Sequence, residues 1–205
     1  MTSITEIAPV IPVVTIDDPD SAVPIARALL DGGVGIIELT LRTPSALDSL
    51  ARIARQVPEI ALGAGTVLDA PTVERAVAAG AQFLVSPGTT PTLLAAMERC
   101  GLPFLPGAAT VSEAMVLLER GHETLKFFPA VAAGGTAMLA AIAAPLPQLR
   151  FCPTGGITPQ TAGDFLALSN VDCVGGSWFT PADAVATGDF ARVSELAAQS
   201  LALRP

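Results

Sequence analysis

A single lysine interrupts an apolar segment of the chain, LKFFP at residues 125–129. In a β-strand successive side chains alternate between two faces, so Lys126 and Phe128 would share one face. Lysines are rarely buried without a partner or a chemical purpose. A dry site disfavours the charged ammonium, and the neutral amine can attack a ketone to form a Schiff base. The residues alone leave open a plainer reading, in which Lys126 reaches solvent or pairs with a carboxylate.

A second charge amid apolar residues is Glu38, in the segment IIELTLR at residues 36–42. It has the same alternation that would point its side chain inward. A carboxyl in an apolar site can serve as a general acid and base. The alternative is a structural ion pair with Arg42, four residues further on. Arg42 is also a rigid two-pronged donor that suits a carboxylate ligand.

Thr66 follows the segment GAG at residues 63–65, where glycine lets a ligand approach the main chain closely. Its hydroxyl would add a hydrogen-bonding group at that point. Taken alone, such a threonine is more commonly a helix cap or a turn residue. GAG also lacks the third glycine of the dinucleotide-binding fingerprint, so it supports a nucleotide site only weakly.

Two glycine-rich segments end consecutive apolar runs, PTGGIT at residues 153–158 and VGGSW at residues 174–178. Main-chain N–H groups in such loops, near helix N-termini, can bind a phosphate without any lysine. A tight turn explains each glycine pair separately. Their consecutive positions favour a phosphate site, because the last two loops of a barrel are its usual place.

Residue types on which many enzymes depend are scarce in this chain. His122 is the only histidine, there is no tyrosine, and the three cysteines at positions 100, 152 and 173 form no CxxC pair. We interpret the cysteines as small core residues in a reducing compartment. A metal site built from several histidines is excluded, so we expect no metal and no other cofactor. A carboxylate-rich magnesium site stays open as an alternative.

The positions of these groups follow from a regular alternation of elements. Eight short apolar segments end at Thr15, Thr40, Thr66, Pro87, Gly107, Pro129, Gly156 and Ser177. Stretches of helical length lie between them, and several open on Ser, Thr or Asp and close on Gly. This pattern predicts an α/β fold, a single (β/α)8 TIM barrel forming one domain over residues 1–205. A Rossmann-like open sheet is the alternative. In a barrel, Glu38, Thr66 and Lys126 would gather at the carboxyl ends of the strands.

The bulk properties limit the partners. The chain has 205 residues, 51% of them hydrophobic, and a net charge of -8, with no cluster of Lys and Arg that would bind nucleic acid. Its first ten residues lack the features of a secretory signal, so we expect a cytoplasmic protein. Residues 127–149 carry no charge, but glycines and prolines divide them, so no membrane span is expected.

At this point the chain resembles a known family, the 2-keto-3-deoxy-6-phosphogluconate (KDPG) aldolases, which also includes 4-hydroxy-2-oxoglutarate (KHG) aldolases. The matching motifs, in order, are ELTLRT, GAGTVL, FLVSPG, FLPG, TVSEAM, LKFFPA, FCPTGGI and GGSWF. The resemblance implies a class I, metal-independent aldolase of the Entner–Doudoroff pathway, a homotrimer in most members. Its substrate would be a phosphorylated keto acid split into pyruvate and glyceraldehyde 3-phosphate. Several members also split 4-hydroxy-2-oxoglutarate into pyruvate and glyoxylate.

The resemblance also assigns roles to residues. It makes Lys126 the Schiff-base lysine and Glu38 the proton shuttle. The substrate-binding residues that it implies are Arg42 and Thr66 at the pyruvate carboxylate, Phe128 beside the lysine, and Thr154, Gly155, Gly156, Gly176 and Ser177 at the phosphate. The segment VAAGG at residues 131–135 departs from relatives that are more polar there. The rival functions are a phosphate-binding isomerase or synthase barrel, a metal-dependent pyruvate aldolase and a non-enzymatic binding module.

Overall fold

The structure is a computed structural model that describes residues 3–203, and its strands and helices alternate along the chain. The strands are β1 (Val10–Val14), β2 (Ile36–Thr40), β3 (Ala61–Gly65), β4 (Phe83–Val85), β5 (Phe104–Leu105), β6 (Gly107–Ala108), β7 (Thr124–Phe127), β8 (Arg150–Pro153) and β9 (Val174–Gly176). They coincide with the apolar segments of the sequence. Such segments suit strands of a parallel sheet that is covered by helices.

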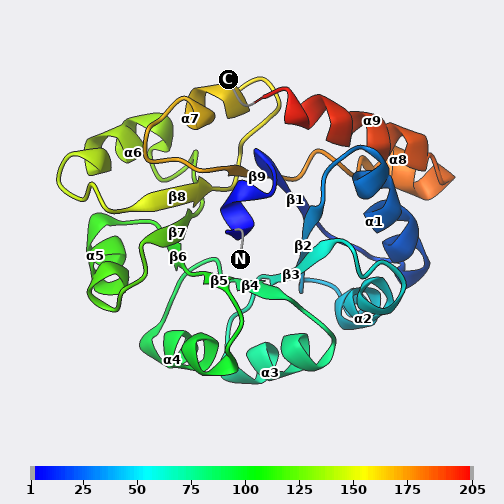
Figure 1. Cartoon of the computed structure of the whole chain (residues 1–205), viewed down its shortest axis with the longest axis horizontal. Helices are drawn as coiled ribbons and strands as arrows, with labels where there is room; N and C mark the ends of the chain where they lie inside the picture. The colour runs from blue at the N-terminus through cyan, green and yellow to red at the C-terminus, as the bar shows by residue number, and fades with distance from the viewer. Residues whose placement is uncertain (1–2, 204–205) are drawn as a thin grey trace.

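The helices form a ring outside the strands (Figure 1). They are α1 (Ala22–Asp31), α2 (Ala46–Gln56), α3 (Ala70–Ala78), α4 (Pro91–Cys100), α5 (Val111–Glu119), α6 (Gly135–Ala143), α7 (Ala162–Leu166), α8 (Ala182–Thr187) and α9 (Phe190–Leu201), with short 3-10 helices η1 (Ile4–Glu6) and η2 (Pro19–Ser21). Each of the helices from α1 to α7 follows a strand and returns the chain to the start of the next strand, as parallel pairing requires.

The strands pair in parallel and close on themselves. One sheet has the order β5-β4-β3-β2-β1-β9 and the other has the order β6-β7-β8. A single residue, Pro106, separates β5 from β6. Because proline has no N–H to donate to a ladder, the strand predicted to end at Gly107 is divided in two. Bridges from Phe151 to Val171 and from Thr154 to Gly175 join β8 to the β9 segment. The barrel prediction is confirmed, and the open-sheet alternative is wrong.

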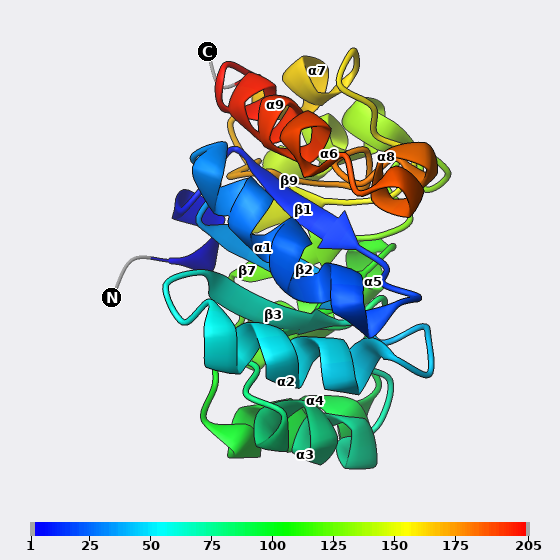
Figure 2. The same ribbon diagram turned by 90° about the vertical axis from the view of Figure 1, so that its right-hand side faces the viewer.

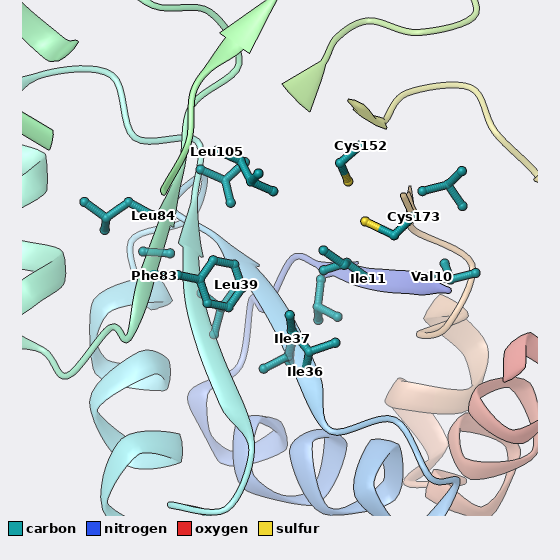
Figure 3. Packing of buried hydrophobic residues seen from close by; sticks show 14 of the residues in the cluster. Val10, Ile11, Ile36, Ile37, Leu39, Phe83, Leu84, Leu105, Cys152 and Cys173 are labelled. Carbon is teal, nitrogen blue, oxygen red and sulfur yellow. The ribbon is translucent and has the colours of Figure 1, made fainter. Parts of the chain in front are cut away.

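Apolar side chains fill the space between strands and helices and part of the barrel interior. Phe83, Phe127, Phe151 and Phe179 are among the largest fully buried side chains. Phe127 and Phe151 meet edge to face on neighbouring strands, with ring centroids 6.2 Å apart. Figure 3 shows Ile36, Ile37, Leu39 and Phe83 packed with other members of this core. The core holds the strands, and with them the polar side chains that they carry.

Local capping signals fix several helix ends. The side chains of Asp69, Thr90 and Thr110 accept hydrogen bonds from the first turns of α3, α4 and α5. Gly101 ends α4 in the left-handed conformation that favours glycine. Gly32 ends α1 with a negative φ, and the residue with positive φ is the next one, Gly33.

The first described residues lie against one end of the barrel. Helix η1 is at the centre of the view in Figure 1, and Figure 2 places it at the end where the strands begin. Thr5 of η1 is buried at 1% exposure. This 3-10 helix therefore covers the end of the barrel opposite the carboxyl ends of the strands.

Residues 127–149, which are free of charge, contain the loop after β7 and the nine-residue helix α6. Among the described residues no helix has both the length and the apolar character that crossing a membrane demands. The extent of a single domain over residues 1–205 stays a prediction.

Candidate active site

Strands β2 and β7 bring Glu38 and Lys126 together across the barrel. Lys126 Nζ lies 3.0 Å from Glu38 Oε1 and 3.4 Å from Oε2, although the two residues are 88 positions apart in the chain. Each residue is only 3% exposed. Both side chains therefore point into the barrel, as the strand alternation predicts. The structure thus meets the first requirement of the predicted chemistry, an amine and a carboxyl in contact away from bulk water.

The glycine that ends β3 makes room for the carboxyl. A Cβ atom at Gly65 would lie 2.2 Å from Glu38 Oε1, much closer than atoms approach without bonding. No larger residue at position 65 would allow this position of Glu38. The sequence analysis missed this role, although Gly65 ends the strand paired with β2 and the register places it beside Thr40.

A buried amine and carboxyl in contact can exchange a proton. Leaving one charge buried without the other would be costly. Transfer of a proton from Lys126 to Glu38 makes both groups neutral and leaves a nucleophilic amine. The contact also agrees with the plainer interpretation, in which Lys126 pairs with a carboxylate. Glu38, by contrast, does not form the alternative ion pair with Arg42, since within residues 3–203 its ion-pair partner is Lys126.

An aromatic ring lies on the other side of the lysine. Lys126 Nζ is 5.5 Å from the centroid of the Phe128 ring, within the range of a cation–π contact. Phe128 follows β7 directly and precedes Pro129 through a cis peptide bond. The structure therefore brings Phe128 to the lysine, as the sequence predicts.

Arg42 and Thr66 meet at the carboxyl ends of β2 and β3. Arg42 Nε donates to Thr66 Oγ1 at 3.0 Å. Thr66 has a φ of 60°, a left-handed conformation that is unusual for a β-branched residue and that recurs at functional sites. Arg42 is exposed and forms no ion pair with any residue from 3 to 203, so its other N–H groups are available to a ligand. Thr66 is thus a hydrogen-bond partner of Arg42 and not a helix cap.

The two glycine-rich loops lie next to each other and next to the loop after β7. Main-chain N–H groups of Ala130 and Val131 donate to the carbonyls of Thr154 and Gly155 at 2.8 and 3.1 Å. Gly155 and Gly156 have φ values of 105° and 78°, which favour glycine. A Cβ at Gly155 would lie 3.2 Å from the Phe128 ring, so the same glycine lets the loop approach the lysine pocket.

The remaining residues of the predicted phosphate site are placed beside this loop. Thr154 is buried and faces Gly175 across the β8–β9 bridge, Gly176 lies under the Trp178 ring, and Ser177 is exposed. The following helices, α7 and α8, begin only at Ala162 and Ala182 and are five and six residues long. The donors that these loops offer to a phosphate are therefore loop amides and hydroxyls, without a long helix behind them.

A pair of threonines near the site was not found by sequence reasoning. Thr15 Oγ1 and Thr40 Oγ1 are 2.8 Å apart, at the carboxyl ends of β1 and β2. Thr40 is fully buried, whereas Thr15 is exposed. The available signal was the spacing, because Thr40 follows Glu38 by two residues and shares its face of the strand.

The single histidine lies elsewhere. His122 comes before β7, where its Nε2 is 3.1 Å from Glu98 Oε1 and its ring packs on Phe104. In the part of the chain that the structure describes, no three His, Cys, Asp or Glu side chains gather as metal ligands would.

Comparison with known proteins gives consistent relatives. The family described as KDPG and KHG aldolase matches residues 1–196. A KHG/KDPG aldolase of Escherichia coli (strain K12) is 48% identical over 199 residues, which cover 97% of this chain and 93% of that protein. A 2-dehydro-3-deoxy-phosphogluconate aldolase of Zymomonas mobilis is 43% identical over 202 residues, covering 98% and 95%.

Solved structures show the same similarity. A KDPG aldolase from Legionella pneumophila, in which pyruvate was captured as a covalent carbinolamine, has a TM-score of 0.94 and 44% identity, covering 96% of each chain. The aldolase of Zymomonas mobilis ZM4 with 3-phosphoglycerate has a TM-score of 0.91 and 42% identity, covering 98% of this chain and 94% of that one.

Proposed function

This chain belongs to the KDPG and KHG aldolase family, and from that premise we propose that it is a class I aldolase that cleaves KDPG to pyruvate and glyceraldehyde 3-phosphate. The observation that carries the proposal is the buried contact of 3.0 Å between Lys126 and Glu38. An isomerase or a metal-dependent aldolase is not favoured, because the similar Legionella protein holds pyruvate as a covalent carbinolamine, the adduct that precedes an imine.

Lys126 forms the covalent bond to the substrate. Its neutral amine attacks the C2 ketone to give a carbinolamine, which loses water and becomes a protonated imine. The imine draws electrons from the neighbouring C3–C4 bond. Burial keeps water away from this intermediate, and the Phe128 ring lies over the nitrogen as charge develops on it.

Glu38 moves the protons. It takes the proton of Lys126 before attack and gives a proton to the hydroxyl that leaves the carbinolamine as water. The carboxylate, ionised again, then takes the proton of the C4 hydroxyl as the C3–C4 bond breaks. The aldehyde leaves, and the enamine on Lys126 receives a proton at C3. Hydrolysis of the resulting imine releases pyruvate and restores the amine.

The two ends of the substrate are held by different loops. The guanidinium of Arg42, supported by Thr66, binds the carboxylate, since a charged two-pronged donor suits this group. Gly155, Gly156 and Ser177, with Thr154 and Gly176 beneath them, bind the phosphate. Fixing both ends aligns the C3–C4 bond with the imine, and such alignment lowers barriers by up to about 7–11 kcal/mol.

The second substrate is 4-hydroxy-2-oxoglutarate, which the enzyme splits into pyruvate and glyoxylate. The name of the Escherichia coli relative includes this activity. The keto-acid half is the same in both substrates, so Lys126, Glu38 and Arg42 serve both. The shorter substrate carries no phosphate, and the glycine-rich loops add nothing to its binding.

The enzyme acts as a homotrimer in the cytoplasm. Family resemblance supports the trimer. Light scattering of the purified protein tests it: a trimer has three times the 20.8 kDa mass of the chain.

Borohydride trapping tests the reaction. The protein is incubated with pyruvate and borohydride, and the modified peptide is identified by mass spectrometry. We expect a reduced pyruvate adduct on Lys126 and loss of KDPG cleavage in the trapped enzyme. Lys126→Arg keeps a positive charge beside Glu38 but should form no adduct. Turnover without an adduct, or an adduct on a peptide that does not contain Lys126, would refute the imine route.

A further inference from the structure

Two cysteines lie in the same layer of the barrel wall as the reactive lysine. In the β7–β8 ladder Lys126 pairs with Cys152. Across the next interface Phe151 pairs with Val171 and Thr154 pairs with Gly175, so the register shifts by one residue in the segment that contains Cys173. Residues paired in register on parallel strands point to the same face. Because Lys126 points into the barrel, Cys152 does so as well.

The two thiols face each other inside the barrel. In Figure 3 the sulfur atoms of Cys152, in β8, and Cys173, directly before β9, point toward one another. Cys152 is 3% exposed and Cys173 is fully buried. Neither residue is joined in a disulfide, and the third cysteine, Cys100, is a half-buried residue at the end of α4.

The proposed aldol cleavage uses neither of these thiols. Lys126 and Glu38 supply the nucleophile and the proton carrier, and Arg42 and the glycine-rich loops hold the substrate. Two nucleophilic groups next to the reactive lysine are therefore unexplained by that reaction. Core packing alone would require only small apolar residues at these positions.

We propose that Cys152 and Cys173 are an oxidation site, which a hydroperoxide converts into a disulfide within one chain. One thiolate attacks the peroxide oxygen, forming a sulfenic acid and releasing water after proton transfer. The second thiol attacks the sulfenic sulfur, the S–S bond forms, and a second water leaves. The two sulfurs lose two electrons together, and hydrogen peroxide is reduced to two molecules of water.

The spacing of neighbouring strands suits a disulfide. Neighbouring strands are about 4.7–4.9 Å apart, and the Cα atoms of disulfides are usually about 4.4–6.8 Å apart. Cys152 is in β8 and Cys173 directly precedes β9, which bridges β8, so the two cysteines are neighbours across this interface. Cys100 has no such partner, since it lies on an outer helix where its Sγ donates to the Met97 carbonyl.

An oxidant can reach the pair by the route that the substrate takes. Cys152 and Lys126 have the same exposure of 3%. If a keto acid reaches Lys126, as the proposed function requires, a molecule as small as hydrogen peroxide reaches the neighbouring thiol. Pyruvate reduced onto Lys126 should then slow the oxidation, because it occupies this route.

Peptide mapping of the wild-type protein tests the proposal. The folded enzyme is treated with hydrogen peroxide, alkylated under denaturing conditions, digested and analysed by mass spectrometry. We expect a cross-linked Cys152–Cys173 peptide, lighter than its two halves by two hydrogen atoms, while Cys100 remains open to alkylation. Reduction with dithiothreitol should restore alkylation of both cysteines. If Cys152 and Cys173 stay alkylatable, or are found only as sulfinic acids, the proposal is wrong.

Variants separate this site from general oxidation. Cys152→Ala and Cys173→Ala should each abolish the cross-link, whereas Cys100→Ala should leave it unchanged. The wild-type mapping decides the question even if an alanine variant folds poorly. Borohydride trapping of pyruvate in an untreated part of the same sample tests the proposed function separately. An adduct without a cross-link refutes only the oxidation site, and a cross-link without an adduct refutes only the imine route.

Discussion

At the scale of single residues, Glu38 has more than one task in the proposed cycle. It lies 3.0 Å from the lysine nitrogen and must also serve the C4 hydroxyl and C3 of the substrate. A carboxyl can do this because it accepts and returns a proton without moving far. An amide of the same shape can still accept a hydrogen bond from Lys126 but cannot take its proton.

Glu38→Gln should therefore separate binding from cleavage. We expect kcat for KDPG to fall by about 10²–10⁴-fold, the usual contribution of a general acid or base. Borohydride trapping of pyruvate on Lys126 should continue, but more slowly. Stopped assays and mass spectrometry measure the two effects, and Glu59→Gln on the surface is the control. Unchanged turnover in Glu38→Gln would remove Glu38 from the mechanism.

Arg42 acts through charge and shape, so its replacement should weaken the hold on the keto acid. For Arg42→Gln we expect kcat/KM for KDPG to fall by about ten- to a hundredfold, the value of a hydrogen bond to a charged group. The pyruvate concentration needed for half-maximal trapping should rise in proportion. Arg55→Gln, an exposed arginine on α2, is the matched control. Equal effects of the two substitutions would contradict a role in carboxylate binding.

The contact of Glu38 with Lys126 was within reach of the sequence, and other parts of the site were not. Alternation along two apolar strands predicts that both side chains point inward, and eight strands predict that they meet. The space that Gly65 leaves for the carboxyl depends on the register of β2 with β3, which no local pattern reports. The same is true of the Thr15–Thr40 pair, whose members belong to different strands.

At the scale of elements, a capping box begins helix α5. Glu113 accepts hydrogen bonds from the main-chain N–H groups of Ala109 and Thr110 at 2.8 and 3.0 Å. These bonds, that from Ala109 most of all, hold the pKa of Glu113 below its ordinary value of 4.5. The folded state therefore favours the ionised carboxylate at this position.

The stability of the protein should depend on this carboxylate only when it is ionised. A lowered folded pKa stabilises the fold above the ordinary value, and the contribution is lost as the pH falls through the folded value. Glu113→Gln should thus be less stable than wild type at neutral pH, with the difference shrinking below pH 4.5. Urea unfolding over a pH series measures it, and Glu119→Gln on the same helix is the control. A difference that grows on acidification would contradict the assignment.

Element boundaries show where local signals suffice. The caps at Asp69, Thr90 and Thr110 and the glycine at position 101 agree with the sequence pattern. The break at Pro106 does not follow from the apolar run around it, because the run reads as one strand. Pro106 lacks a ladder donor, and the two halves that it separates have different partners, since β5 pairs with β4 whereas β6 pairs with β7.

At the scale of the whole molecule, the last helix packs against the first. Gly32 at the end of α1 lies under α9, where an added Cβ would be 2.4 Å from the Ser194 carbonyl oxygen and 2.5 Å from Ala197 Cβ. Figure 2 shows the two helices side by side on one flank of the barrel. This contact joins the N-terminal part of the chain, at α1, to its C-terminal part, at α9.

Gly32→Ala should destabilise the protein without altering its chemistry. Because the methyl group has no space, we expect a loss of about 1–3 kcal/mol in the free energy of unfolding, as in other overpacked sites. The kcat of the folded variant should equal that of wild type, since Lys126 lies in the barrel interior. Gly163→Ala is the control, because a Cβ there meets nothing within 4 Å. Equal stabilities of the two variants would show that α1 and α9 can move apart.

Helix η1, at Ile4–Glu6, lies across the end of the barrel where the strands begin. In the proposed cycle, substrate therefore enters and products leave at the opposite end, where the carboxyl ends of the strands lie. In the proposed cycle the aldehyde half carries no bond to the protein, so it departs first. Pyruvate, still tethered to the lysine, departs last, and free pyruvate in the medium is the product that re-enters the vacant enzyme.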